Sequence, residues 1–311
     1  MLAGFFLHSV EEGLLFGILT LGVYISFRVL NFPDLTVDGS FPLGAAVAGT
    51  LISRGLNPLL TLPVAILAGA LAGLMTGFLH TKLKIAPLLA GIITMICLYS
   101  INLRIMGRPN ISLSPYLGHS TVISLLKGLN LPLKNVYLIP LVFLLVVFAL
   151  KLLLDLFLHT ESGLAIRATG NNEEMARSQG INTDTSKLIG LSVSNGLVAL
   201  AGALFAQYQG FSDIGMGIGM IIAGLASVII GGALIRGKTI GWITLGVIVG
   251  AIVYRLASAA ALKWGYDLGF KPTDLKLLTG LLVIAILGFP ILRAKIRTKT
   301  ARLPADTAIR K

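Results

Sequence analysis

Charged side chains are scarce in this chain of 311 residues: Asp, Glu, Lys and Arg make up 12% of it, whereas 55% is hydrophobic. Soluble domains carry about 25% charged residues. Half that fraction, a mean hydropathy of +0.90 and long apolar runs exclude an ordinary soluble domain and predict an all-α integral membrane protein. The 36 glycines favour close packing between transmembrane helices.

Other absences exclude whole classes of site. With a single cysteine, Cys97, the chain forms no internal disulfide. The four histidines are scattered without metal-ligand spacing, and no paired His and Glu or Ser and His indicate a catalytic site. No G-x4-GK[ST] motif is present to bind the phosphates of ATP. We therefore expect a chain that is not an enzyme and holds no metal or cofactor of its own.

Basic residues give the chain a net charge of +12, but no nucleic-acid motif accompanies them. In membrane proteins, Lys and Arg gather in the cytoplasmic loops. With the N-terminus outside, the segments predicted to be inside carry more Lys and Arg than those outside, chiefly because of the tail 293–311. We therefore expect an outside N-terminus, a cytoplasmic C-terminus, and no nucleic-acid partner.

Runs of about 20 apolar residues predict transmembrane helices. Such runs lie near residues 12–30, 60–80, 86–106, 135–158, 185–208, 217–235, 239–258 and 274–292. A further run, 41–53, is short, and it crosses the membrane only if the preceding stretch FPDLTVDGS also lies at membrane depth. We expect about nine spans, with one short or broken helix in the first half; eight to ten spans stay open.

Two pairs of similar segments indicate related halves. NFPDLTVDGSFPLGAAVAG, from residue 31, resembles GFSDIGMGIGMIIAGLASV, from residue 210, and LLAGIITMICLYSINLR (88–104) aligns without gaps on LLTGLLVIAILGFPILR (277–293). The number of intervening spans makes this an inverted-topology repeat, a common plan among transporters. We expect a single domain over 1–311, made of repeat one (12–106), a connector helix (135–158), a cytoplasmic loop (159–184), repeat two (185–292) and the basic tail.

The most polar internal segment, HTESGLAIRATGNNEEMARSQGINTD, follows the connector helix. Asn171 or Asn172 can cap a helix N-terminus, and Glu173 and Glu174 then lie in the first turn, where the helix dipole favours acids. Gly180 can end the helix in a left-handed conformation. These signals predict a helix of about two turns outside the membrane. On these residues alone, a polar connector that happens to be helical explains the segment equally well.

Residues 174–180, EMARSQG, look like the EAA-x3-G element of ABC transporter permeases, with Met175 in place of the middle residue. The flanking GLAIRATGNN and the earlier NFPDLTVDGSFPLGAAVAG are similar to the same regions of branched-chain amino acid and sugar importer permeases. Within that group the chain is closest to a subgroup sometimes linked to aromatic amino acids. The resemblance covers roughly residues 12–292.

The resemblance implies a multi-pass permease subunit of a bacterial ABC importer in the cytoplasmic (inner) membrane, which forms the path for a small solute such as an amino acid. It implies three partners: a cytoplasmic ATPase subunit that binds ATP and Mg, an extracytoplasmic substrate-binding protein, and a second permease copy in a homodimer. The helix in the loop would be the coupling helix that docks on the ATPase. Its candidate contact residues are Asn172, Glu173, Glu174, Ala176, Arg177 and Gly180.

The stretch FPDLTVDGS places two carboxylates, Asp34 and Asp38, in a very apolar region. Pro33 interrupts a helix, so the stretch predicts a break between two helical pieces. Acids near the bilayer centre cost about 2.5–3.5 kcal/mol on insertion scales and usually indicate a pathway or a paired site. The alternative is that they cap the following helix or lie at the water interface. Candidate path residues are Asp34, Thr36, Asp38, Ser40 and Asp213.

Three other functions remain open from the residues alone. A stand-alone ion-coupled secondary transporter also fits inverted repeats and intramembrane acids, but it leaves the NNEEMARSQG helix unexplained. An intramembrane enzyme needs a catalytic constellation that we do not find. A membrane scaffold without transport predicts that Asp34 and Asp38 affect no flux.

Overall fold

The computed structural model describes residues 2–114, 119–128, 135–235, 237 and 239–267, and five single positions nearer the C-terminus (277, 280, 281, 283 and 284). Contacts divide the chain into one unit that ends at Leu256 and a second that begins at Ala257. The second unit is described only by the end of one helix and by the five single positions.

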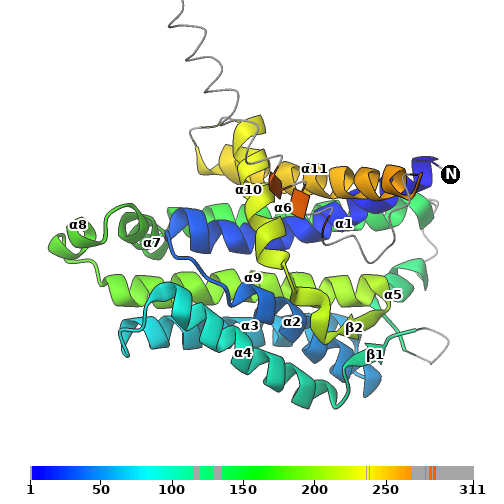
Figure 1. Ribbon diagram of the computed structural model, residues 1–311, viewed down its shortest axis with the longest axis horizontal. Coiled ribbons are helices and arrows are strands. Elements are labelled where there is room, and N and C mark those ends of the chain that lie inside the picture. The colour runs from blue at the N-terminus through cyan, green and yellow to red at the C-terminus, as the bar shows by residue number, and fades with distance from the viewer. Residues whose placement is uncertain are drawn as a thin grey trace, which may run out of the picture. The chain divides into compact units, whose positions relative to one another are not determined.

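The described chain is helical apart from two short strands (Figure 1). In order, its elements are α1 (Leu2–Val23), the π-helix η1 (Tyr24–Val29), α2 (Val37–Ser53), α3 (Pro58–Thr81), α4 (Pro87–Met106), β1 (Asn110–Ser112), α5 (Val122–Gly128), α6 (Asn135–His159), α7 (Glu161–Asn171), α8 (Glu173–Ser178), α9 (Thr183–Gln209), β2 (Phe211–Asp213), the 3-10 helix η3 (Ile214–Gly217), α10 (Met220–Leu234) and α11 (Ile240–Asp267).

Seven described segments are long and apolar enough to cross a membrane: Phe6–Val29, Pro58–Thr81, Pro87–Met106, Tyr137–His159, Thr183–Gln209, Ile214–Leu234 and Ile240–Gly265. They match seven of the predicted spans. The short run 41–53 forms most of α2, whose 17 residues are at the lower limit of the length that a membrane crossing requires. The predicted span 274–292 is described at only the five single positions, and the tail 293–311 lies outside the described residues.

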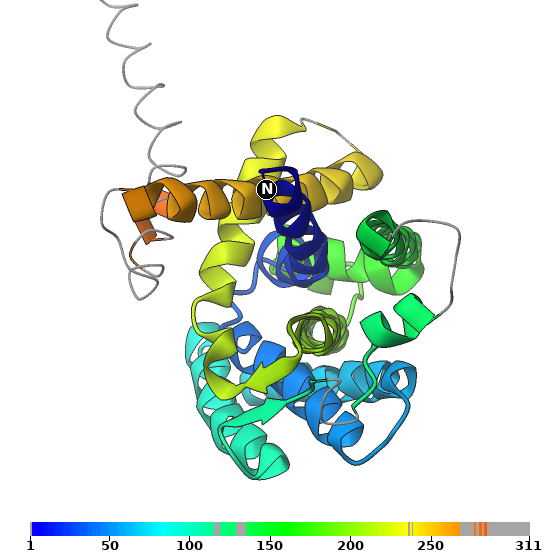
Figure 2. The same cartoon turned by 90° about the vertical axis from the view of Figure 1, so that its right-hand side faces the viewer.

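Helix α9 lies at the centre of the first unit, where α3, α2 and α1 pack around it (Figure 2). Glycines permit this packing. A methyl group at Gly44 of α2 would overlap the backbone of Ala199, and one at Gly202 of α9 would overlap the backbone of Phe41. Small residues of this kind let membrane helices approach closely. The central helices are therefore held by backbone-to-backbone contact.

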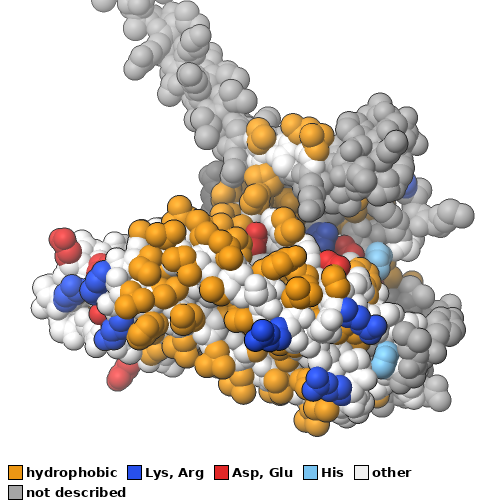
Figure 3. Space-filling model, turned by 60° about the horizontal axis from the view of Figure 1, so that its bottom comes forward, with side chains coloured by type: hydrophobic (Ala, Val, Ile, Leu, Met, Phe, Trp, Pro, Cys, Tyr) orange, Lys and Arg blue, Asp and Glu red, His pale blue; other side chains and the backbone are white. Residues whose placement is uncertain are grey.

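The outer helices expose their apolar side chains. Leu67 and Leu71 of α3, Leu145 of α6 and Ile96 of α4 are each at least 60% exposed. Figure 3 shows hydrophobic side chains over much of one such face. Because no aqueous surface favours so many exposed apolar groups, these faces fit a lipid environment or a second protein copy.

The predicted break before α2 is confirmed. Residues 30–36 are not helical, and α2 begins about halfway along α9 (Figure 1). The backbone of Leu35 lies against Gly91 of α4, and α2 is buried along most of its length. The broken backbone is therefore enclosed by protein, which is the condition for tolerating it at membrane depth.

The two strands were not predicted. β1 pairs antiparallel with β2, with Ile111 opposite Ser212. They lie at the same end of the bundle as the N-terminus of α1, whereas α7 and α8 lie at the opposite end (Figure 1). The candidate site residues therefore lie in three regions: the end that carries α8, the helix break near mid-length and, for Asp213 of β2, the end that carries the strands.

Candidate functional site

The polar loop forms two helices, so the prediction of one helix was incomplete. The hydroxyl of Thr160 accepts the N–H of Gly163 and caps α7. Ile166 is fully buried, and Gly170 lies against the backbone of Val29. These contacts hold α7 against the bundle. The Thr-Glu-Ser sequence at 160–162 was the available signal, because Thr is a favoured N-cap residue.

Helix α8 has the ends that its sequence predicts. The side chain of Asn172 accepts the N–H of Met175 at 2.9 Å. At the other end, the N–H of Ile181 donates to the carbonyl of Ala176 at 3.1 Å, and Gly180 adopts a φ of +84°. This is the Schellman arrangement, in which glycine accommodates the left-handed turn. A helix of only six residues is thus fixed at both ends.

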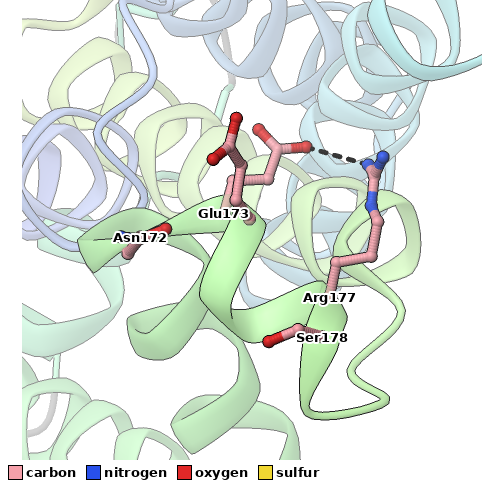
Figure 4. Close-up of a pocket in the computed structure, with 5 residues that line it drawn as sticks. Asn172, Glu173, Arg177 and Ser178 are labelled. Carbon is pink, nitrogen blue, oxygen red and sulfur yellow. Dashed lines mark hydrogen bonds and ion pairs between the residues drawn. The ribbon is translucent and has the colours of Figure 1, made fainter.

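Glu173 ties α8 to the centre of the bundle. Both of its carboxylate oxygens lie 2.8 Å from the Nζ of Lys187 in α9, and Arg177 donates to it at 3.1 Å (Figure 4). Lys187 also contacts the Nε2 of His80, at the end of α3, at 3.2 Å. The hydrogen bond from Lys187 lowers the pKa of Glu173, so this carboxylate stays ionised at neutral pH.

The rest of α8 faces outward. Ala176 is 4% exposed and points into the protein, whereas Met175 is 61% exposed. Glu174, Arg177 and Ser178 of α8 are also exposed, as are the flanking residues Asn172, Gln179 and Gly180. A hollow of about 670 Å³ is lined by Asn172, Glu173, Glu174, Arg177 and Ser178. Met175 was not among the predicted contact residues, although an apolar residue among charged ones in a loop was a usable signal.

In the helix break, Asp34 is fully buried and hydrogen-bonded. Its carboxylate accepts the N–H of Thr36 at 2.9 Å and the side-chain amide of Asn195 in α9 at 2.7 Å. The hydroxyl of Ser40 donates to the other end of the Asn195 amide at 2.7 Å. Thr36 and Thr76 of α3 pair through their hydroxyls at 2.6 Å. Three of the predicted path residues therefore form one polar network that joins α2 to α9 and α3.

Asp38 caps a helix, but not the one that follows it. Its two carboxylate oxygens accept the N–H groups of Gly219, at 3.0 Å, and Ile221, at 2.8 Å. Gly219 is the residue just before α10 and Ile221 is its second residue, so the carboxylate stabilises the N-terminus of a helix in the other half of the chain. Asp38 also lines a cavity of about 370 Å³.

Asp213 has a local role at the end of the bundle that carries the strands. Its side chain accepts the N–H of Gly215 at 2.7 Å and thereby caps η3. Its second oxygen accepts the side-chain amide of Asn110 at 3.4 Å. The structure does not bring Asp213 into the network around Asp34.

Two ion pairs within the candidate membrane spans were not predicted. Lys151 and Asp155 of α6 lie 2.6 Å apart, and the hydroxyl of Thr244 in α11 donates to Asp155 at 2.7 Å. Glu12 of α1 pairs with Arg255 of α11 at 3.5 Å. Charged groups in membrane segments are tolerated when paired in this way. Both pairs tie α11 to helices from the first half of the chain or to the connector.

The family model described as "Branched-chain amino acid transport system / permease component" matches residues 7–287. The chain is 42% identical over 294 residues to a "Tyrosine transport system permease protein" of Clostridioides difficile, covering 94% of each chain. It is 38% identical to an uncharacterised protein of Rickettsia prowazekii, covering 88% of this chain and 94% of the relative. It is 31% identical to a "Probable branched-chain amino acid transport permease protein LivH" of Methanocaldococcus jannaschii, over 78% of each chain.

Proposed function

The chain belongs to the family of branched-chain amino acid transport permeases, and we propose that its own substrate is an aromatic amino acid, with tyrosine as the first candidate. As a member of this family it is the membrane-spanning permease subunit of a bacterial ABC importer, and it transports rather than catalyses. The substrate proposal is supported by 42% identity over almost the full length to a relative named for tyrosine transport.

The proposal includes α8 as the coupling helix, which docks on a separate cytoplasmic ATPase. One observation carries it: a short helix fixed at both ends and tied to α9 by Glu173 projects Met175 into solvent. Because both of its ends are fixed, such a helix can transmit a movement of the ATPase to the transmembrane helices as a rigid body. Of the candidate contact residues, Asn172 and Gly180 shape the helix and Ala176 packs beneath it. Glu174 and Arg177, together with Met175, offer the contact surface.

The remaining parts of the assembly follow from the family plan. A substrate-binding protein would deliver the solute from outside, and a second copy of this chain would complete a homodimer. The inverted repeat is supported by a shared pattern. A non-helical Phe-x-Asp segment precedes α2 at 32–34, and another, which forms β2, precedes η3 and α10 at 211–213. We retain repeat one (12–106), the connector and repeat two (185–292) as the proposed domain plan.

The coupling proposal is tested by affinity purification of the tagged chain from native membranes in mild detergent, with mass spectrometry of its partners. Met175→Asp should lose the ATPase, because a charge replaces an apolar contact, whereas Met175→Leu should retain it. Met175 is exposed, so neither change should unfold the chain, and size-exclusion chromatography checks this. An ATPase that remains bound to Met175→Asp as firmly as to the unmodified chain would refute the docking role of α8.

Gly180→Trp is a less clean test of the same surface. Its side chain would enter open space, but the φ of +84° disfavours any residue with a Cβ. A loss of ATPase in that variant would combine a blocked surface with a strained helix end.

A further inference from the structure

The cavity that Asp38 lines lies beside the helix break. Its walls come from the start of α2, from α4, and from the segment of η3 that leads to α10. Its volume of about 370 Å³ falls in the range of about 300–1,000 Å³ that is typical of small-molecule sites. Most of the wall is apolar, with Pro42, Met95 and Ile214 contributing. The cavity is thus large enough for a small solute, and three of its lining residues belong to the first two turns of α2. The ribbon of α2 begins about halfway along the bundle (Figure 1).

Asn102, which lines this wall, has a buried side-chain oxygen without a hydrogen-bond partner in the part of the chain that the structure describes. The side-chain amide of Asn102 is fully buried, and its Nδ2 donates to the carbonyl of Gly39 at 3.2 Å. Its Oδ1 has no hydrogen-bond partner among the described residues. An unsatisfied buried acceptor is costly, so the site favours a ligand that brings a donor.

The other polar groups of the wall have the same preference. The carboxyl oxygens of Asp38 can accept more hydrogen bonds than the two that they receive from α10. Tyr99 and Ser100 also line the cavity, and a hydroxyl group can accept a hydrogen bond as well as donate one. No Lys or Arg is among the described lining residues. Acceptors without a compensating cation select a positively charged donor such as an ammonium group.

We propose that this cavity is a binding site at membrane depth for the transported amino acid. The site holds the ammonium group at Asp38 and the Oδ1 of Asn102, and the side chain against the apolar wall and the Tyr99 ring. The inference rests on the proposed function and adds the location and the chemistry of recognition. Non-helical backbone borders the site on two sides, before α2 and before α10, as is typical of transporter sites formed by discontinuous helices.

The position of Tyr99 permits a test of whether the cavity faces an aqueous path or lipid. Tyr99 of α4 is 58% exposed, and Leu145, in the middle of the α6 span, is 60% exposed. In a Cys97→Ser background, Tyr99→Cys should react with a membrane-impermeant cationic methanethiosulfonate reagent, and tyrosine should slow that reaction. Leu145→Cys should stay unreactive, because it faces lipid. Equal, slow labelling at both positions would place the cavity against lipid and overturn the inference.

Ligand chemistry gives the second test, on the permease–ATPase complex in nanodiscs without the substrate-binding protein. Binding of radiolabelled tyrosine is measured in competition with two analogues. Tyramine keeps the ammonium group and the ring, whereas 4-hydroxyphenylpropionate keeps the ring and the carboxylate but lacks the ammonium group. The acid should compete roughly 10- to 100-fold more weakly than tyramine, because it leaves charged and buried acceptors unpaired. Equal competition, or stronger competition by the acid, would overturn the proposed recognition.

Variants separate this inference from the proposed function. Tyr99→Ala and Asn102→Leu should each raise the KM for tyrosine uptake by the full importer about tenfold or more. Tyr137→Ala is the matched control, since Tyr137 is 62% exposed but does not line the cavity, and its uptake should be unchanged. If the unmodified importer takes up tyrosine and all three variants show the same KM, the inference about the cavity is wrong, but the proposed substrate stands. If the unmodified importer takes up no aromatic amino acid, the proposed substrate fails.

Discussion

The ion pair between Glu173 and Lys187 should respond very differently to removal of one partner or the other. The side chain of Lys187 is 11% exposed, whereas that of Glu173 is 39% exposed. Glu173→Ala leaves a buried ammonium group with only His80 as a partner within hydrogen-bonding distance among the described residues. Breaking a buried pair in this way costs about 3–5 kcal/mol, and we expect about 2–3 kcal/mol here because His80 remains and Glu173 is partly hydrated.

Lys187→Met should be much milder. Glu173 is then left near the surface, where water solvates it and Arg177 still donates to it at 3.1 Å. An exposed ion pair is worth about 0–1 kcal/mol, so a loss of about 0.5–1 kcal/mol is expected. The double variant should resemble Lys187→Met alone, since no buried charge remains. The two changes are therefore expected to be non-additive by about 2 kcal/mol.

Hydrogen exchange measured by mass spectrometry reports the local opening free energy of α8 and is the suitable assay. Glu173→Ala should accelerate exchange of the α8 amides far more than Lys187→Met. Equal effects of the two single variants, or additive effects in the double variant, would refute the view that Glu173 is held by a buried Lys187.

The same pair sets a pH dependence for α8. The folded pKa of Glu173 is depressed, chiefly by the Lys187 hydrogen bond, so the stabilisation is fully present above the unfolded pKa of about 4.3. It is lost as the pH falls through the lower, folded pKa. Protection of the α8 amides, corrected for intrinsic exchange rates, should be flat from about pH 5 to 8 and should fall only in more acidic solution. A decline centred near neutral pH would contradict this assignment.

Three further variants test the helix break and the packing around it. Asp38→Ala removes both acceptors at the N-terminus of α10 and should lower the free energy of unfolding, measured by thermal unfolding, by about 1–2 kcal/mol. Asp38→Asn should lower it less. Equal melting temperatures of the Ala and Asn variants would contradict the capping role. Asp34→Ala should lower the yield of folded protein and its uptake activity together, because Asn195 and Thr36 lose a buried acceptor. Normal stability with lost uptake would instead assign Asp34 to the translocation path. Gly44→Ala should destabilise by about 1–3 kcal/mol through overlap with α9, whereas Gly232→Ala, which meets no atom within 4 Å, should be neutral or slightly stabilising. Equal effects of the two glycine substitutions would mean that close helix contact is not what Gly44 provides.

The sequence predicts features whose causes are local. Asn172 and Gly180 define α8 because capping depends on a few neighbouring residues, and the break at Pro33 follows from the chemistry of proline. Seven of the spans follow from hydropathy alone. The break before α2 and the short helix α8 were both predicted from local causes, and the structure shows the same break and the same helix caps.

Long-range partners account for what the sequence did not predict. Asp38 was expected to cap its own helix or line a path, but its N–H donors come from α10 in the other half of the chain. Asn195 bridges Asp34 and Ser40, and its only sequence signal was an isolated amide in an apolar run. Glu173 was assigned to the ATPase contact, whereas its shortest hydrogen bonds, 2.8 Å at each carboxylate oxygen, come from Lys187. Pairings of this kind depend on how helices pack, which hydropathy does not specify.

ATP-driven uptake in proteoliposomes tests the central claim most directly. The tagged chain, its ATPase and its binding protein are reconstituted together, and accumulation of labelled tyrosine is followed with and without internal ATP. We expect accumulation that requires ATP and the ATPase, is abolished by Met175→Asp, and is insensitive to collapse of ion gradients. Uptake by the chain alone that follows an ion gradient would contradict it and would indicate a secondary transporter.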